Sequence, residues 1–305
     1  MKKNAVFVIL LIGLIAASCS EKAPFGVKVA NNLGLTSISR SGDNFYTINF
    51  YQGKPIDIQY GTSHDEFEYH SGLIYKWLSF DHENKLTLTV IYSYDAMGRI
   101  ASIEYNPTKP PLWGDTLTNT TNYTDNQIVS IWNSRHGYIR KSKMTLNQQG
   151  VIIMDEVSHL DGTINSAKYA YSNGNLTSCT LSNSKNSETE FRSFTYLNKK
   201  NSYYNYYKKF LFGAEWKNNS AIDFPDNNLD DPFLPPFSQS VYPQVSQNLI
   251  STYSMGKVSA SVGHEFDHQD NLKTQIEELT FADGSKRTII TYFIYKYGPK
   301  KSGSV

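Results

Sequence analysis

The sequence has almost no cysteine: Cys19 and Cys179 are the only two among 305 residues. Cys19 ends an N-terminal pattern that predicts its modification, which leaves Cys179 without a partner in the chain. The mature protein therefore holds no intrachain disulfide, although the same pattern predicts that it leaves the cytoplasm. Its stability must come from a hydrophobic core.

An excess of charge of one sign is also missing, since 29 basic residues nearly balance 28 acidic residues and leave a formal net charge of +1. A chain with this balance presents no strong field to nucleic acid or to an acidic polymer. We therefore expect no nucleic-acid partner. Long hydrophobic runs are missing as well, because the uncharged run at residues 5–17 is too short for a comfortable membrane-spanning helix.

That uncharged run has instead the features of an export signal, because two lysines precede it and small residues follow it. It ends in Ala16-Ala17-Ser18-Cys19, which resembles the bacterial lipobox, in which the cysteine becomes the acylated first residue. Ala16 stands where leucine is usual. We predict a signal peptide over residues 1–18, lipidation at Cys19, a membrane anchor there, and a tether over residues 19–32. A simple secretory signal cut at the same small residues is the alternative.

Aromatic residues are plentiful, with 22 Tyr and 16 Phe, and they suit strands whose rings lie half buried on a pleated surface. The stretch Tyr92–Tyr105, YSYDAMGRIASIEY, reads as a strand, a turn and a second strand. Large apolar residues alternate up to Tyr94, stop at Asp95, and resume at Ile100, as a β-hairpin requires. Gly98 is predicted to supply the positive φ of the turn.

Looser forms of this hairpin unit recur six times, which predicts a chain built of repeated hairpins. The further copies lie at residues 80–86, 123–128, 146–151, 171–176, 253–258 and 266–272.

Four residues of the first unit, Tyr94, Asp95, Gly98 and Arg99, match a known pattern, Tyr-Asp-x-x-Gly-Arg. The unit thereby resembles YD repeats, the hairpin units of RHS-type shells. Over most of its mature length the chain is more similar to functionally uncharacterised Bacteroidetes lipoproteins, built from degenerate hairpins after a lipoprotein signal. This resemblance implies a β-sheet protein on a membrane and carries over no catalytic residues. Ser20-Glu21-Lys22 resembles the short tag that sends such lipoproteins to the cell surface.

We predict an all-β fold, a long curved antiparallel sheet built as a meander of hairpins and rolling towards a partial barrel. One β-repeat domain is expected over residues 33–298 and a disordered tail over residues 299–305. Residues 198–247 break the regularity with clustered aromatic residues and prolines, and they are predicted to form an irregular excursion over one face or edge of the sheet.

His264-Glu265-Phe266-Asp267-His268 spells HExxH, the signature of zinc proteases. Chelation by this motif needs a helix, on which residues four apart lie about 6 Å from each other. Here the preceding residues alternate and Gly263 interrupts them, which favours a strand. The two histidines would then lie about 13 Å apart, too far for a common metal. We therefore expect no zinc, no other metal and no cofactor.

The excursion offers two further candidate sites. Asp223, Asp226, Asp230 and Asp231 provide oxygen ligands but not the spacing of a calcium loop, so we interpret them as a solvated acidic loop. A cluster of rings is a candidate binding platform for sugars or a partner protein. Packing over the open edge of the sheet is the alternative for the same rings. The platform residues are Tyr203, Tyr204, Tyr206, Tyr207, Phe210 and Trp216.

No catalytic residue is assigned, because the chain has no G-x-S-x-G elbow and Cys179 has no histidine near it in sequence. Glu277 and Glu278 would point to opposite faces of a strand, so they form no acid–base pair. The function we predict is a binding or scaffolding module, lipid-anchored at the outer membrane or cell surface, with a glycan or an envelope protein as partner. An envelope hydrolase acting on glycan or peptide and a purely structural component of an outer-membrane complex are the alternatives.

Overall fold

The computed structural model describes residues 34–41, 45–51, 54–108, 116–148, 151–185, 189–201 and 246–296. The described residues form eighteen strands. Strands β1 to β9 span Leu35–Arg40, Tyr46–Tyr51, Lys54–Tyr60, Ser63–His70, Leu73–Phe80, Leu86–Tyr94, Ile100–Pro107, Leu117–Tyr123 and Gln127–Ser134. Strands β10 to β18 span Gly137–Leu146, Ile152–His159, Ile164–Ser172, Asn175–Asn183, Thr189–Lys200, Asn248–Met255, Val258–Phe266, Leu272–Phe281 and Lys286–Tyr295. A helix with the length and hydropathy of a membrane span is not found within these ranges.

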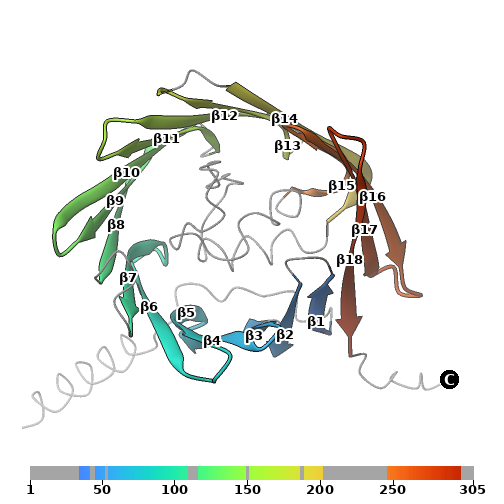
Figure 1. The fold of residues 1–305 in the computed structure, drawn as a ribbon, viewed down its shortest axis with the longest axis horizontal. Helices are drawn as coiled ribbons and strands as arrows, with labels where there is room; N and C mark the ends of the chain where they lie inside the picture. The colour runs from blue at the N-terminus through green and yellow to red at the C-terminus, as the bar shows by residue number, and fades with distance from the viewer. Residues whose placement is uncertain are drawn as a thin grey trace, which may run out of the picture.

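The strands form a closed antiparallel barrel (Figure 1). Each strand pairs with the next one along the chain, and β1 closes the ring by pairing with β18 as well as with β2. Ile38 of β1 lies at this seam, opposite Ile48 of β2 on one side and Phe293 of β18 on the other. The predicted all-β meander is confirmed, and its curvature reaches full closure.

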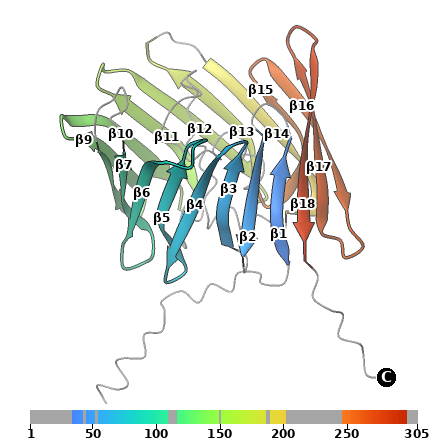
Figure 2. The same ribbon diagram turned by 60° about the horizontal axis from the view of Figure 1, so that its bottom comes forward.

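The first strand starts and the last strand ends at the same rim of the barrel, as Figure 2 shows for β1 and β18. The backbone N–H of Lys296 donates to the carbonyl oxygen of Gly34 at 2.7 Å. We call this end the terminal rim and the opposite end the distal rim. Because the strands alternate in direction, hairpins from an even-numbered strand to the next lie at the terminal rim, and the others lie at the distal rim.

The two faces of the closed sheet differ in chemistry. On β1, β2 and β3, the mutually opposed residues Ile38, Ile48 and Ile58 are 0%, 3% and 0% exposed. The pairing register shows which residues of each following strand share this buried face. Because no described element packs on the outside of the ring, the buried face is the inner face. We call it the inner wall. Its buried residues include Trp77, Val90, Tyr105, Trp132, Met144, Ala167, Cys179, Leu181, Phe194, Tyr253, Ala260, Leu279 and Phe293.

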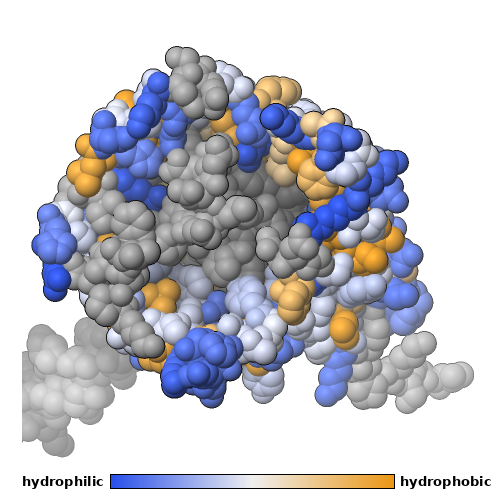
Figure 3. Space-filling view, in the orientation of Figure 1, coloured by the Kyte–Doolittle hydropathy of each residue, from blue (hydrophilic) through white to orange (hydrophobic). Residues whose placement is uncertain are grey.

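The opposite face, the outer wall, is mainly polar. It carries hydroxyl, amide and charged side chains that face one another on neighbouring strands, with exceptions such as Phe191 and Tyr292. In the view along the barrel in Figure 3, hydrophilic residues in blue predominate around the perimeter, with hydrophobic residues in orange between them. Its paired residues include Ser39 with Thr47, Thr89 with Asn106, Lys143 with Glu156, Ser166 with Ser182, Thr195 with Thr252, and Ser261 with Glu278. The period-two alternation of the sequence therefore separates an apolar inside from a polar outside.

All seven stretches predicted as hairpin units connect consecutive strands of the barrel. In the unit between β6 and β7, Oδ1 of Asp95 accepts the backbone N–H groups of Met97 and Arg99, both at 2.9 Å. Gly98 has φ +74°, a left-handed conformation that glycine adopts without steric cost. The aspartate and the glycine therefore fix the turn together.

The same turn chemistry recurs in two other units. Oδ1 of Asp81, between β5 and β6, and Oδ1 of Asp267, between β16 and β17, each accept the backbone N–H groups two and four residues further on. Asn84 with φ +59° and Asp270 with φ +64° take the place of the glycine. These residue types tolerate the left-handed region better than other side chains do.

Tyrosines at the ends of even-numbered strands hydrogen-bond to the strands before them. Each directs its phenolic O–H to a backbone carbonyl at the start of the preceding odd-numbered strand, so all these bonds lie at the terminal rim. A buried phenol needs such a partner, because an unpaired hydroxyl inside a protein costs free energy. The bonds are Tyr69 to Pro55 at 2.6 Å, Tyr94 to Ile74 at 2.7 Å, Tyr123 to Ile100 at 2.8 Å, Tyr196 to Leu176 at 2.6 Å, and Tyr295 to Leu272 at 2.7 Å.

Removal of one of these hydroxyl groups tests its contribution. Tyr94→Phe leaves the ring in place and deprives the Ile74 carbonyl of its donor, so we expect a loss of about 1 kcal/mol in the free energy of unfolding. The control is Tyr75→Phe on the outer wall next to Ile74, where the ring is 43% exposed and the change should be near zero. Urea unfolding of both variants measures the difference, and equal stabilities would contradict the assigned role.

Candidate functional site

Most of the sequence-predicted site residues lie outside the described residues. These are the lipidation site Cys19, the aromatic platform and the four aspartates of the acidic loop. Their roles stay predictions. The platform residues are Tyr203, Tyr204, Tyr206, Tyr207, Phe210 and Trp216.

The HExxH stretch is a strand in its first part and a turn in its second. His264 lies in β16 opposite Gln275 on the inner wall, whereas Asp267 and His268 belong to the turn that follows. His268 is exposed. The helical arrangement that chelation by this motif requires is therefore not formed. Among the described residues, no three His, Cys, Asp or Glu side chains gather in a way that could hold a metal ion.

His264 itself is a half-buried, neutral imidazole. Burial, and then the positive charge of Lys199, lower its pKa to about 4. Neither ring nitrogen has a hydrogen-bond partner, and the ring stacks on that of Phe266 with 6.5 Å between centroids. At neutral pH it carries no charge.

The thiol of Cys179 is buried in β13 on the inner wall. Burial raises its pKa to about 12, so the reactive thiolate is scarce at neutral pH. This residue behaves as a small hydrophobic side chain.

A cluster of charged and polar side chains surrounds Glu277 on the inner wall. Arg40 reaches from β1 across β18 and places Nη1 at 3.3 Å from Oε1 of Glu277 and Nη2 at 3.4 Å from Oε2. The hydroxyl of Tyr253 donates to Oε2 at 2.9 Å, and Nε2 of Gln275 donates to Oε1 at 3.2 Å. Both partners of the ion pair are buried, with side chains 11% and 5% exposed. The ion pair therefore links β1 to β17 across the intervening β18, in surroundings where an unpaired charge is costly.

A second buried carboxyl group belongs to Asp155 of β11. Its Oδ1 accepts a hydrogen bond from Oγ of Ser142 at 3.1 Å, whereas Oδ2 has no partner. Burial raises the pKa of this carboxyl to about 7, against the opposing effect of the Ser142 bond. Asp155 is therefore largely protonated below neutral pH.

A third carboxyl group, that of Asp65 on β4, lies among the side chains of Tyr60, Trp77 and Ser79. Burial raises its pKa, and the polar groups of these neighbours act in the opposite direction. The Tyr60 hydroxyl and the Trp77 indole N–H lie close to the carboxyl without well-aligned hydrogen bonds to it. The three carboxyl groups thus occupy separate parts of the inner wall.

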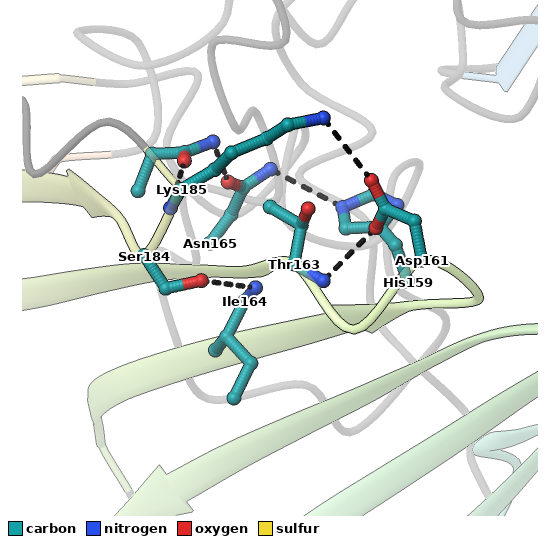
Figure 4. A network of polar contacts seen from close by, with 8 residues as sticks. His159, Asp161, Thr163, Ile164, Asn165, Ser184 and Lys185 are labelled. Atoms are coloured by element: carbon teal, nitrogen blue, oxygen red, sulfur yellow. Dashed lines mark hydrogen bonds and ion pairs between the residues drawn. The ribbon is translucent and has the colours of Figure 1, made fainter.

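At the distal rim, a polar network joins the end of β11 to β12 and β13 (Figure 4). The side chain of Asn165 is hydrogen-bonded to Nε2 of His159 at 3.2 Å and accepts from Nδ2 of Asn183 at 2.6 Å. At the edge of the network, Nζ of Lys185 lies 3.5 Å from Oδ2 of Asp161. The contacts are local and consistent with a structural role at the rim.

None of these described clusters joins a nucleophile, a base and a donor for a developing negative charge. Sequence reasoning missed the roles of Asp65, Asp155 and Glu277. The signal that identifies them is an acidic residue at an inward-facing position of an otherwise alternating strand.

No family model matches the chain, and no curated protein matches it. Among solved structures, it is similar to a porin-like protein from Bacteroides uniformis, with 9% identity, 87% of this chain and 97% of the other covered, and a TM-score of 0.34. A porin-like protein from Bacteroides vulgatus shares 12% identity, covering 87% and 99% of the two chains, with a TM-score of 0.39. A Photorhabdus luminescens Tc holotoxin pore shares 10% identity over 80% of this chain and 13% of that one, with a TM-score of 0.29. Similarities this weak say nothing about activity.

The Arg40–Glu277 pair gives a test with a control one residue away. Glu277→Gln keeps the size of the side chain and leaves a buried guanidinium without its carboxylate, so the free energy of unfolding should fall by about 3 kcal/mol. Glu278→Gln, on the outer wall, should change it by less than about 0.5 kcal/mol. Urea unfolding at pH 7 compares the two, and a Glu277→Gln protein as stable as the control would contradict the assignment.

Asp155 predicts a pH dependence of stability. Its pKa of about 7 in the folded protein exceeds the ordinary value near 3.9, so between these values the folded chain holds a proton that the unfolded chain has released. The free energy of unfolding should therefore fall as pH rises from about 4 to about 7, by roughly 3 kcal/mol from this residue.

Asp155→Asn should remove that part of the slope, because it keeps the shape and cannot ionise. Asp161→Asn at the distal rim is the control: hydrogen bonds from Thr163 lower the pKa of Asp161, so its replacement should leave the slope between pH 5 and 7 unchanged. Urea unfolding at several pH values measures both slopes, and an unchanged slope in Asp155→Asn would contradict the prediction.

Proposed function

We propose that the protein is a cell-envelope lipoprotein, attached at the outer membrane or cell surface through Cys19, whose barrel stands in water as a binding or scaffolding module. The observation that carries the proposal is the polarity of the two walls. A barrel whose outer wall is polar is not held in a membrane by its own strands, so it needs a separate anchor. The lipobox-like sequence ending at Cys19 would provide this anchor.

The outer wall is the wrong surface for lipid. A barrel that crosses a bilayer presents an apolar band about 25 Å tall to the hydrocarbon and keeps polar side chains inside. Here the middle of the strands carries the reverse arrangement, with Thr89, Lys143 and Ser166 pointing outwards and Val90, Met144 and Ala167 inwards. Burying charged and hydroxyl groups such as these in hydrocarbon would be costly.

The position of the chain ends supports an orientation. Gly34 lies at the terminal rim, hydrogen-bonded to Lys296, and only fifteen residues separate it from Cys19, since 34 − 19 = 15. Fully extended, such a tether spans at most about 50 Å. The terminal rim would therefore stay near the membrane, and the distal rim with the outer wall would face a glycan or an envelope protein partner.

The anchor is tested by cell fractionation. Cys19→Ala should move the protein from the membrane fraction to the soluble fraction, because the acyl chains on this residue would provide the attachment. Its melting temperature should stay nearly unchanged, because the tether precedes the first strand. Cys179→Ala is the matched control, since it removes the other cysteine and should stay with the membrane.

A Cys19→Ala protein that stays in the membrane fraction after a high-salt wash would place the attachment elsewhere. A released protein with a melting temperature several degrees lower would show that the tether belongs to the fold.

A further inference from the structure

An apolar inner wall in a barrel of this size needs something to cover it. Barrels of eight strands are filled by their own side chains, whereas barrels of sixteen to eighteen strands are wide enough to leave a channel. The described barrel has eighteen strands. Its own side chains therefore cannot fill it, and the inner wall carries large apolar residues such as Trp77, Tyr105 and Phe194.

The hydrophobic clusters run along the wall rather than across the barrel. Trp77, Val90, Tyr105, Leu117 and Trp132 form one cluster on the successive strands β5 to β9. The largest cluster occupies the arc from β9 to β17, and a third occupies the seam around β1. Side chains on opposite parts of the wall do not provide each other with a core.

The inner wall also holds buried polar atoms that lack hydrogen-bond partners. The described residues with such atoms include Asp155 with Oδ2 and Thr291 with Oγ1, whereas the Tyr60 hydroxyl and the Trp77 indole N–H lie close to the Asp65 carboxyl without a well-aligned bond. An unpaired buried polar group costs about 1–3 kcal/mol. A chain segment with free backbone N–H and carbonyl groups is the kind of occupant that would satisfy them.

The two ends of the longest insertion between strands are fixed at the inner side of the terminal rim. Asn201 follows β14 and Ser246 precedes β15, and both are buried, at 8% and 0% exposure. The backbone N–H of Asn201 donates to the Gln247 carbonyl at 2.8 Å, and its Nδ2 donates to the Ser246 carbonyl at 3.2 Å. The Ser246 hydroxyl donates to the hydroxyl of Tyr196 at 2.8 Å, on the same face of β14 as the inner-wall residue Phe194.

The insertion has the length and composition of a filling. Between Asn201 and Ser246 lie 44 residues, and eleven of them are aromatic: five Tyr, five Phe and Trp216. That is 25%, against 14% for the whole chain. Extended, 44 residues reach about 150 Å, enough to cross the barrel several times. Five prolines exclude long regular elements and suit an irregular path.

We propose that residues 202–245 dock against the inner wall and form the filling of the barrel. Their rings cover the apolar arcs, and their backbone groups pair with the polar atoms of the wall. The predicted aromatic platform, from Tyr203 to Trp216, then contributes to the core and is not an external binding surface. The proposal stands independently of the anchor at Cys19.

Cysteine labelling of the mature protein in detergent tests this docking. In a Cys179→Ala background, single variants Phe210→Cys, Trp216→Cys and Phe233→Cys are treated with a water-soluble maleimide. Leu160→Cys is the control, because Leu160 lies in a distal-rim turn and is 70% exposed. The three segment cysteines should react on the order of 100-fold more slowly than the control, as expected for groups released only by local opening. Reaction at the control rate would overturn the proposal.

Photo-crosslinking keeps the test independent of substitutions that weaken the core. Benzoylphenylalanine at position 210, itself large and aromatic, should crosslink within one chain to peptides that carry inner-wall residues such as Ile58 or Val90. Crosslinks between two chains would assign the occupant of the wall to a second copy. Crosslinks to outer-wall peptides, or to another envelope protein, would show that the segment lies outside the barrel. Each of these three results would overturn the proposal.

Discussion

The pairing of β1 with β18 is the constraint on which the rest of the structure depends. While a sheet is open, both its faces and its two edges are available to solvent or to other chains. Once Ile38 lies opposite both Ile48 and Phe293, the edges disappear and the faces become an inside and an outside. Every strand then places mainly apolar side chains inside the ring and mainly polar side chains outside it.

The terminal rim shows how hairpin turns link the strands of this ring. At the turn between β6 and β7, the Tyr94 hydroxyl donates to a carbonyl of the preceding strand, the Asp95 carboxylate fixes the turn, and Gly98 adopts the left-handed φ. Arg99 pairs with Asp95 at 2.7 Å and lies 4.2 Å from the ring centroid of Tyr123, so it contacts the next hairpin. Other units keep some of these interactions with different residues, because the geometry needs an acceptor, a positive φ and a phenol rather than one fixed sequence.

The hairpins could be predicted from the sequence, because turn residues such as Asp95 and Gly98 act locally. Full closure could not, since it depends on the pairing of β1 with β18, more than 250 residues apart. Strand β4 is hard to predict, because its sequence SHDEFEYH is rich in acidic residues and does not alternate clearly between apolar and polar residues. In the structure Asp65 points inwards and Glu66 outwards. Glu277 and Glu278 were expected on opposite faces, and they are, but only the structure shows that Arg40 is the partner of Glu277.

The central claim is that the outer wall of the barrel faces water, and spin labels on that wall test it most directly. Single nitroxide labels at Glu66, Lys141 and Thr252 would report from exposed outward positions of β4, β10 and β15. With the proposed lipid-anchored form of the protein in membrane vesicles, a water-soluble nickel complex should relax all three labels more strongly than dissolved oxygen does. Stronger relaxation by oxygen at all three positions would place the wall in lipid and contradict the claim.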